Sequence, residues 1–154
     1  MAHTFLFEEG EWEASGLLFD EEGSASIASG GVRICHRVDC WEVESWLESL
    51  ENRYTMAPFS PQEVTQQWEA INPAVGIMKG SFVVVGDVIL SRYASEDGLI
   101  KGVESFRQIE PQGYECRGAA LMEGRAVHRW ELAFKKKQTT SAGACVVVGD
   151  LVTP

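Results

Sequence analysis

Apolar and polar residues alternate along much of the second half of the chain, in short runs bounded by turn signals. Alternation of this kind is typical of half-buried β-strands. Turns such as Gly86-Asp87 and Glu123-Gly124 contain glycine, which tolerates the positive φ of a tight hairpin. Strands joined by short turns pair as antiparallel neighbours, so the pattern predicts a meander. The expected strands are Ile77–Val85, Val88–Ala94, Leu99–Ile109, Tyr114–Met122 and Arg125–Lys136.

A meander of this length is expected to close on itself. An open sheet leaves unpaired edges and a wet apolar face, and curling into a barrel removes both. The pattern therefore predicts an all-β fold, an antiparallel up-and-down β-barrel with at most one short helix. We expect residues 1–154 to form a single domain, with the barrel over 8–137 and with 138–154 as a tail or an additional strand.

The first half of the chain has a less regular pattern. Trp12–Phe19 and Ser26–Val38 are expected strands. Trp41–Leu50 also alternates, but a helix over 41–52 fits the same short window, because Glu and Leu are good helix formers. These alternatives stay open at the level of the sequence.

An irregular segment follows, in which Pro58 and Pro61 prevent regular strand pairing. Ser60 is suited to cap a short helix, with Pro61 at its first position. Near the C-terminus, Ala144–Val152 is either one more strand or a tail that pairs with a neighbouring molecule, which would make a homodimer.

The charge of the chain argues against several partners. Residues 1–77 carry 14 Asp and Glu against 3 Lys and Arg, whereas residues 78–154 carry 9 against 10, and the net charge is -10. An acidic chain without an extended basic stripe is a poor candidate for binding nucleic acid or anionic membrane. No run approaches the length of an apolar membrane span. We therefore expect no nucleic-acid partner and no membrane insertion.

The four cysteines form no Cys-x-x-Cys pair and have no companion His cluster. Met1-Ala2-His3 does not resemble the start of a secretory signal. Reduced thiols, a cytoplasmic location and the absence of metal and cofactor are the corresponding expectations.

Two sequence features resemble the calycin superfamily, which includes lipocalins and fatty-acid-binding proteins. Gly10-Glu11-Trp12 opens the first long strand, and Arg129-Trp130 lies in a near-terminal strand. In lipocalins a Gly-x-Trp motif begins the first barrel strand, and its Trp packs under a basic residue of the last strand. The resemblance implies that Trp12 and Arg129, or a residue of Lys135–Lys137, close one end of the barrel through a cation–π contact.

Two kinds of polar residue lie within the expected strands. His36 and His128 sit mid-strand, either as a pair that lines a cavity and binds a ligand polar group or haem iron, or as two separately hydrogen-bonded residues. Arg107 shares its strand phase with Val103 and Ile109 and is our first choice for an inward arginine. A buried Arg needs an anionic partner, and a ligand carboxylate can supply it. Fatty-acid-binding barrels, which the pattern resembles, use Arg and Tyr in this way. The expected ligand-binding residues are Arg107, Tyr114, His36, His128 and Arg37.

No catalytic motif is present: the chain has no Gly-x-Ser-x-Gly elbow, P-loop or His-Glu-x-x-His. The leading hypothesis is non-catalytic binding of a small hydrophobic molecule, with a fatty-acid-like carboxylate as one form of it. Aromatic side chains could instead fill the barrel, although Gly76, Gly80, Gly102 and Gly118 favour interior space. The alternatives are a small barrel enzyme (an isomerase, decarboxylase or chromophore lyase) that uses cavity histidines and acids, and a protein-interaction module.

Overall fold

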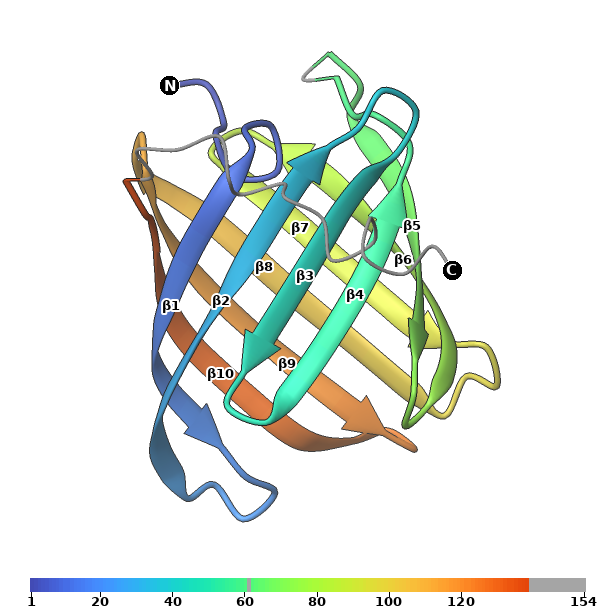
Figure 1. Cartoon of the computed structure of the whole chain (residues 1–154). Coiled ribbons are helices and arrows are strands. Elements are labelled where there is room, and N and C mark those ends of the chain that lie inside the picture. Colours follow the sequence, from blue (N-terminus) through green and yellow to red (C-terminus); the bar gives the residue numbers. More distant parts are fainter. Residues whose placement is uncertain (61, 139–154) are drawn as a thin grey trace, which may run out of the picture.

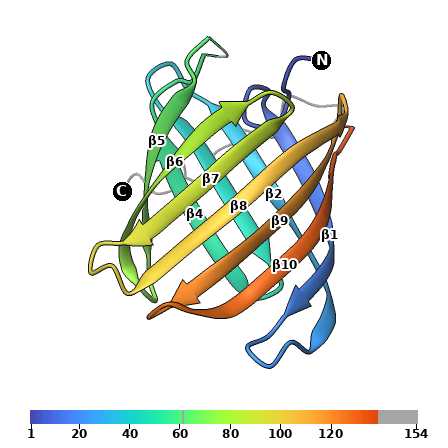
Figure 2. The same cartoon turned by 180° about the vertical axis from the view of Figure 1, so that it is seen from behind.

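The computed structural model describes residues 1–60 and 62–138, which form a closed antiparallel barrel (Figures 1 and 2). Each strand pairs with its neighbours in the sequence, and β1 pairs with β10 to close the wall. The strands are β1 (Gly10–Phe19), β2 (Ala25–His36), β3 (Trp41–Leu47), β4 (Leu50–Met56), β5 (Thr65–Asn72), β6 (Gly76–Val85), β7 (Val88–Ser95), β8 (Ile100–Glu110), β9 (Gly113–Met122) and β10 (Arg125–Lys136). The predicted fold class, an all-β up-and-down meander barrel, is confirmed.

Strands β6 to β10 match the five strands expected from the alternating pattern to within one residue at either end. No helix is found in the part of the chain that the structure describes, so none there could serve as a membrane span. The expected tail or strand over 139–154, including Ala144–Val152, lies outside the described residues.

The segment Trp41–Leu50, expected as one strand or as a helix, is neither. It contains the end of one hairpin strand, a turn at Glu48 and the start of the next strand. Glu48 has a φ of 51°, a conformation that residues other than glycine seldom adopt. Two contacts with β2 hold it there, because the amide of Glu48 donates to the carbonyl of Ser29 (3.0 Å) and the amide of Ser29 donates to the Glu48 carboxylate (2.7 Å).

The short helix expected at Ser60 is also replaced by a turn. The amide of Glu63 donates to the carbonyl of Ser60 (2.9 Å), and the amide of Ser60 donates to the Glu63 carboxylate (3.0 Å). This reciprocal pair resembles a helix capping box, but the chain passes into β5 at Thr65 instead of continuing into a helix.

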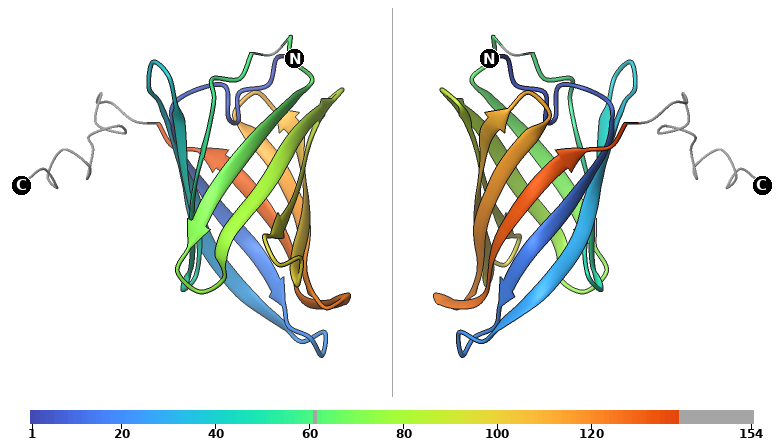
Figure 3. Two further views of the ribbon diagram at one scale, coloured as in Figure 1. Left: turned by 90° about the vertical axis from the view of Figure 1, so that its right-hand side faces the viewer. Right: turned by 90° about the vertical axis from the view of Figure 1, so that its left-hand side faces the viewer.

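One end of the barrel is sealed by the N-terminal segment, which lies across it (Figure 3). Phe5 and Leu6 are fully buried there. The Phe5 ring lies 5.4 Å from the ring of Trp12 and 5.8 Å from that of Tyr114. The Tyr114 hydroxyl accepts the backbone amide of Thr4 (3.0 Å), which fixes the segment to β9. The short apolar start of the chain therefore acts as a plug.

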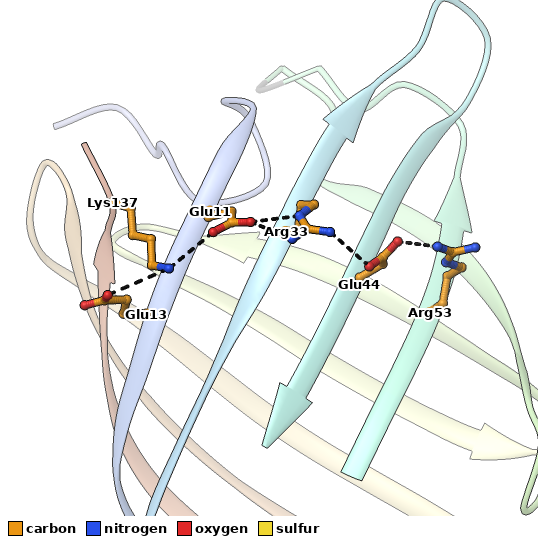
Figure 4. Close-up of polar contacts among 6 residues, drawn as sticks. All are labelled: Glu11, Glu13, Arg33, Glu44, Arg53 and Lys137. Carbon is orange, nitrogen blue, oxygen red and sulfur yellow. Dashed lines mark hydrogen bonds and ion pairs between the residues drawn. The ribbon is translucent and has the colours of Figure 1, made fainter. Parts of the chain in front are cut away.

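The outer surface near the closing seam carries a line of ion pairs (Figure 4). Glu11 on β1 is central to it, because its carboxylate accepts a hydrogen bond from Arg33 (2.7 Å) and one from Lys137 (3.3 Å). The hydrogen bond from Arg33 is the largest cause of a lowered pKa of Glu11. These side chains are partly exposed, so each pair contributes modestly to stability. Following the ion pairs from one residue to the next, the residues are Glu13, Lys137, Glu11, Arg33, Glu44 and Arg53.

Candidate functional site

The barrel is hollow. Below the N-terminal plug it encloses a cavity of about 390 Å³, which lies in the size range of small-molecule sites. The lining reaches the turns at the end opposite the plug, where Leu50 is 51% exposed and Met122 is 46% exposed. Leu47, Val75 and Leu121 line the cavity beside them. One end is thus sealed, and the other forms a mouth, where Glu51, Asn52 and Asn72 line the cavity together with these apolar side chains.

Aromatic rings lie against the wall of the cavity because glycines stand behind them. At four places a ring lies across a glycine on the neighbouring strand, and a Cβ added to that glycine would meet ring atoms at 2.0 to 2.7 Å. A larger residue would therefore push the ring into the cavity. The interior space that the glycines were expected to favour is present, and three of the four named glycines contribute in this way. The pairs are Trp46 over Gly31, Trp68 over Gly80, Tyr93 over Gly102 and Trp130 over Gly118.

Glu104 on β8 is a carboxyl group on the inside of the barrel. Its Oε2 accepts a hydrogen bond from Nε1 of Trp130 (3.1 Å) and a longer one from Sγ of Cys116 (3.6 Å). Oε1 makes no hydrogen bond with a described residue, and it is not among the fully buried side-chain atoms that lack a partner. Two neighbouring strands, β9 and β10, therefore orient the group, and one oxygen is directed to the cavity.

The surroundings of Glu104 oppose its ionisation. Burial raises the pKa of the Glu104 carboxyl, and the hydrogen bonds from Trp130 and Cys116 offset part of that rise. Burial, together with the charge of Glu104, raises the pKa of the Tyr54 and Tyr93 hydroxyls, which stay protonated. Among the described residues no Lys or Arg lines the cavity, so the Glu104 carboxyl has no cationic partner in the chain there.

The two mid-strand histidines lie in different environments. His128 lines the cavity, beside a register shift at Ala126 that brings Val127 to the lining as well, and its buried Nδ1 has no hydrogen-bond partner among the described residues. His36 lies at the sealed end, where its Nε2 is 2.8 Å from the Leu6 carbonyl oxygen and its ring stacks on that of Trp41 at 3.7 Å. The expected histidine pair is therefore not formed, and only His128 faces the cavity.

The expectation that Arg107 points into the barrel is wrong. Its side chain is 61% exposed and lies 3.7 Å from the Asp87 carboxylate on the outer surface. Its neighbours Phe106 and Gln108 are the buried ones, so β8 has the opposite phase to the one expected. Arg37 also lies outside the cavity, in the turn after β2, where it pairs with Glu42 (3.3 Å).

Tyr114 is inside the barrel but does not line the cavity. Its hydroxyl oxygen accepts hydrogen bonds from the backbone amides of Thr4 (3.0 Å) and Phe5 (3.3 Å). The same oxygen lies 3.0 Å from Nδ1 of His3. His3 in turn contacts the carbonyl of Gly86 (2.9 Å) through Nε2. Tyr114 thus holds the plug in place, and no part of it is among the cavity-lining residues.

Trp12 lies at the sealed end of the barrel, as the lipocalin resemblance implied, but Arg129 is not beside it. In the β1–β10 register Trp12 is opposite Lys136, and Arg129 is opposite Phe19, at the other end of β1. The Arg129 guanidinium lies 5.3 Å from the centre of the Phe19 ring. Of the basic residues considered for this position, Lys136 is the one opposite Trp12, and its Nζ pairs with Glu8 (2.5 Å).

Glu104 was not singled out from the sequence, although a signal for it exists. It shares the strand phase of Gly102 and Phe106, a glycine and an aromatic residue that both proved to face inward. Choosing that phase would have placed a carboxyl group inside the barrel. The choice required knowing that the phase with Val103 and Ile109, which are about half exposed, faces outward.

Comparison of the chain with protein-family models gives no match, and neither does a search among curated proteins. In residues 1–60 and 62–138, no group of three or more His, Cys, Asp and Glu side chains is arranged to hold a metal ion. The functional argument therefore depends on the cavity and on the side chains that line it.

Proposed function

We propose that this protein binds a small hydrophobic molecule in the barrel cavity and does not transform it chemically. The observation that carries the proposal is the hollow interior of about 390 Å³, sealed at one end and lined mainly by apolar and aromatic side chains. Burial of apolar surface contributes about 25 cal/mol per Å² to binding. The proposal agrees with the calycin resemblance, in which the Trp12 position marks the sealed end. A calycin-like carrier is the proposed class, and its cytoplasmic location stays a prediction.

A fatty-acid-like ligand fits this cavity less well than a ligand without negative charge. The arginine expected to hold a carboxylate, Arg107, is outside the barrel. The acidic group inside it, Glu104, would repel a carboxylate placed at the same depth. A carboxylate headgroup could be accommodated only near the mouth, where water solvates it.

Two variants of adjacent alanines on β9 test the proposal. Ala120 lines the cavity, whereas Ala119 is the neighbouring position and is absent from the lining. Ala120→Trp should fill the cavity, and Ala119→Trp adds the same side chain to the other face of the strand. Nile red, a neutral apolar dye, should bind the wild-type protein and A119W with equal affinity and should bind A120W at least tenfold more weakly.

The result that would overturn the proposal is Nile red binding to A120W as tightly as to the wild type, or no binding to either. Thermal unfolding of both variants shows whether each remains folded. Native mass spectrometry of the purified wild-type protein gives an independent measurement, since a bound small molecule adds its mass to that of the chain.

The enzymatic alternative has weaker support from the geometry. It requires an acid and a histidine together in the cavity, and Glu104 and His128 do both line it. However, the Glu104 carboxyl accepts its hydrogen bonds from Trp130 and Cys116, and Nδ1 of His128 has no hydrogen-bond partner among the described residues. Without a proton-transfer contact between the two, binding is the better-supported function.

A further inference from the structure

The carboxyl group of Glu104 is more strongly organised than an ordinary cavity needs. Two donors from different strands, Nε1 of Trp130 and Sγ of Cys116, converge on the same oxygen, Oε2. Donors directed at one oxygen fix the rotation of the group and stabilise negative charge on it. The second oxygen, Oε1, is thereby presented to the cavity with no protein partner among the described residues.

No hydrogen bond joins this oxygen to another described polar side chain of the cavity. Nε1 of Trp68 is covered, since the indole lies across Gly80 and the nitrogen faces the wall. His128 is opposite Ala120 in the register, and no hydrogen bond or ion pair joins it to Glu104. Burying a carboxylate without a cation nearby costs free energy, so a positive group that reaches Oε1 would lower that cost.

The walls around this position suit a cation as well. Aromatic side chains from β4, β5 and β7 adjoin one another, with ring centres 4.7 Å apart for Tyr54 and Trp68 and 5.8 Å apart for Trp68 and Tyr93. The indole of Trp130 adds a further ring, from β10, beside the carboxyl group itself. Faces of such rings attract an ammonium group, and Trp does so most strongly.

We infer that the cavity is selective for a hydrophobic amine, whose ammonium group binds Oε1 of Glu104 while its apolar part fills the space toward the mouth. This inference rests on the proposed function and names the ligand class for the same cavity. The ammonium supplies both the hydrogen-bond donor and the charge that Oε1 lacks. Where the carboxyl holds a proton before binding, that proton passes to solvent as the N–H···O bond forms, so charge is balanced.

The ligand class is tested with three probes that share one chain and differ in the headgroup. Octylamine is a cation at pH 7, 1-octanol is neutral and octanoate is an anion. Each is titrated against the wild-type protein loaded with Nile red, and displacement of the dye gives the affinity. Octylamine should bind at least tenfold more tightly than 1-octanol, which corresponds to about 1.4 kcal/mol, and octanoate should bind most weakly.

A matched pair of variants assigns the preference to the carboxyl group. Glu104→Gln keeps the shape of the side chain and removes the charge, and Glu115→Gln makes the same change on the exposed face of β9. The ratio of octylamine to 1-octanol affinity should fall to near one in E104Q and remain at the wild-type value in E115Q. The three-probe series on the wild-type protein decides the question even if E104Q does not fold.

The outcomes separate the two proposals. If 1-octanol or octanoate binds the wild-type protein as tightly as octylamine, or if E104Q keeps the amine preference, the amine inference is wrong and the apolar carrier stands. If neither Nile red nor any of the three probes binds, the proposed function itself fails.

Discussion

Replacing Gly102 with alanine should destabilise the barrel and narrow its cavity at the same time. A Cβ at position 102 would lie 2.0 Å from Cζ of Tyr93 and 2.3 Å from its hydroxyl oxygen. Both distances are shorter than any real contact of a Cβ atom, so either the Tyr93 ring or the backbone at Gly102 must move. Gly102 lies within β8, where pairing with both neighbouring strands holds the backbone in place. The Tyr93 ring must therefore swing into the cavity that it now lines.

The magnitude follows from two opposed effects. Overpacking of a well-packed site costs about 1–3 kcal/mol of unfolding free energy. Replacing glycine with alanine by itself stabilises a strand by about 0.5–1 kcal/mol, because glycine loses more conformational freedom on folding than alanine does. The expected net loss for Gly102→Ala is roughly 1–2 kcal/mol, measured by urea unfolding followed through tryptophan fluorescence.

Gly113→Ala is the matched control. Its new Cβ would meet the Glu110 side chain, with Cγ at 2.6 Å, and that exposed and flexible chain can move aside. G113A should therefore be as stable as the wild type or slightly more stable, and should bind Nile red normally. G102A should bind the dye more weakly. If G102A has wild-type stability and dye affinity, the argument that the glycines create the cavity is refuted.

Two further predictions concern the buried acid and the plug. Burial raises the pKa of Glu104 above its ordinary value of 4.5, so the folded state holds this proton more tightly than the unfolded state. The contribution of Glu104 to stability is therefore largest below that pH and is lost as pH rises through the folded-state pKa. The Tm of E104Q, measured by circular dichroism from acid to neutral pH, should lack the decrease that Glu104 causes in the wild type. A pH profile of Tm identical to that of the wild type would contradict this prediction. Tyr54 and Tyr93 stay protonated over this range and do not contribute to the difference. Phe5→Ala should cost about 3–5 kcal/mol, since the ring is fully buried between Trp12 and Phe134, and a loss below about 1 kcal/mol in urea unfolding would show that the plug does not seal the barrel.

Local chemistry was sufficient to predict the second half of the barrel. Each of the strands β6 to β10 is bounded by turn residues and has a period of two, and both properties act within a few residues of chain. The turn at Glu48 was missed because nothing local marks it: a glutamate adopts a φ of 51° there through contacts with Ser29 on another strand. A hairpin stabilised by long-range contacts has no signature in its own residues.

The candidate site depended on information of another kind. An alternating strand has two faces, and in β8 the sequence offers Val103 and Ile109 on one, Gly102 and Phe106 on the other. Both sets are apolar, so the pattern established the strand without establishing which set faces inward. Closure of the barrel decided it, because pairing β1 with β10 fixes the direction of every strand face at once. That one choice placed Arg107 in solvent and Glu104 in the cavity, and so exchanged the expected cationic site for an acidic one.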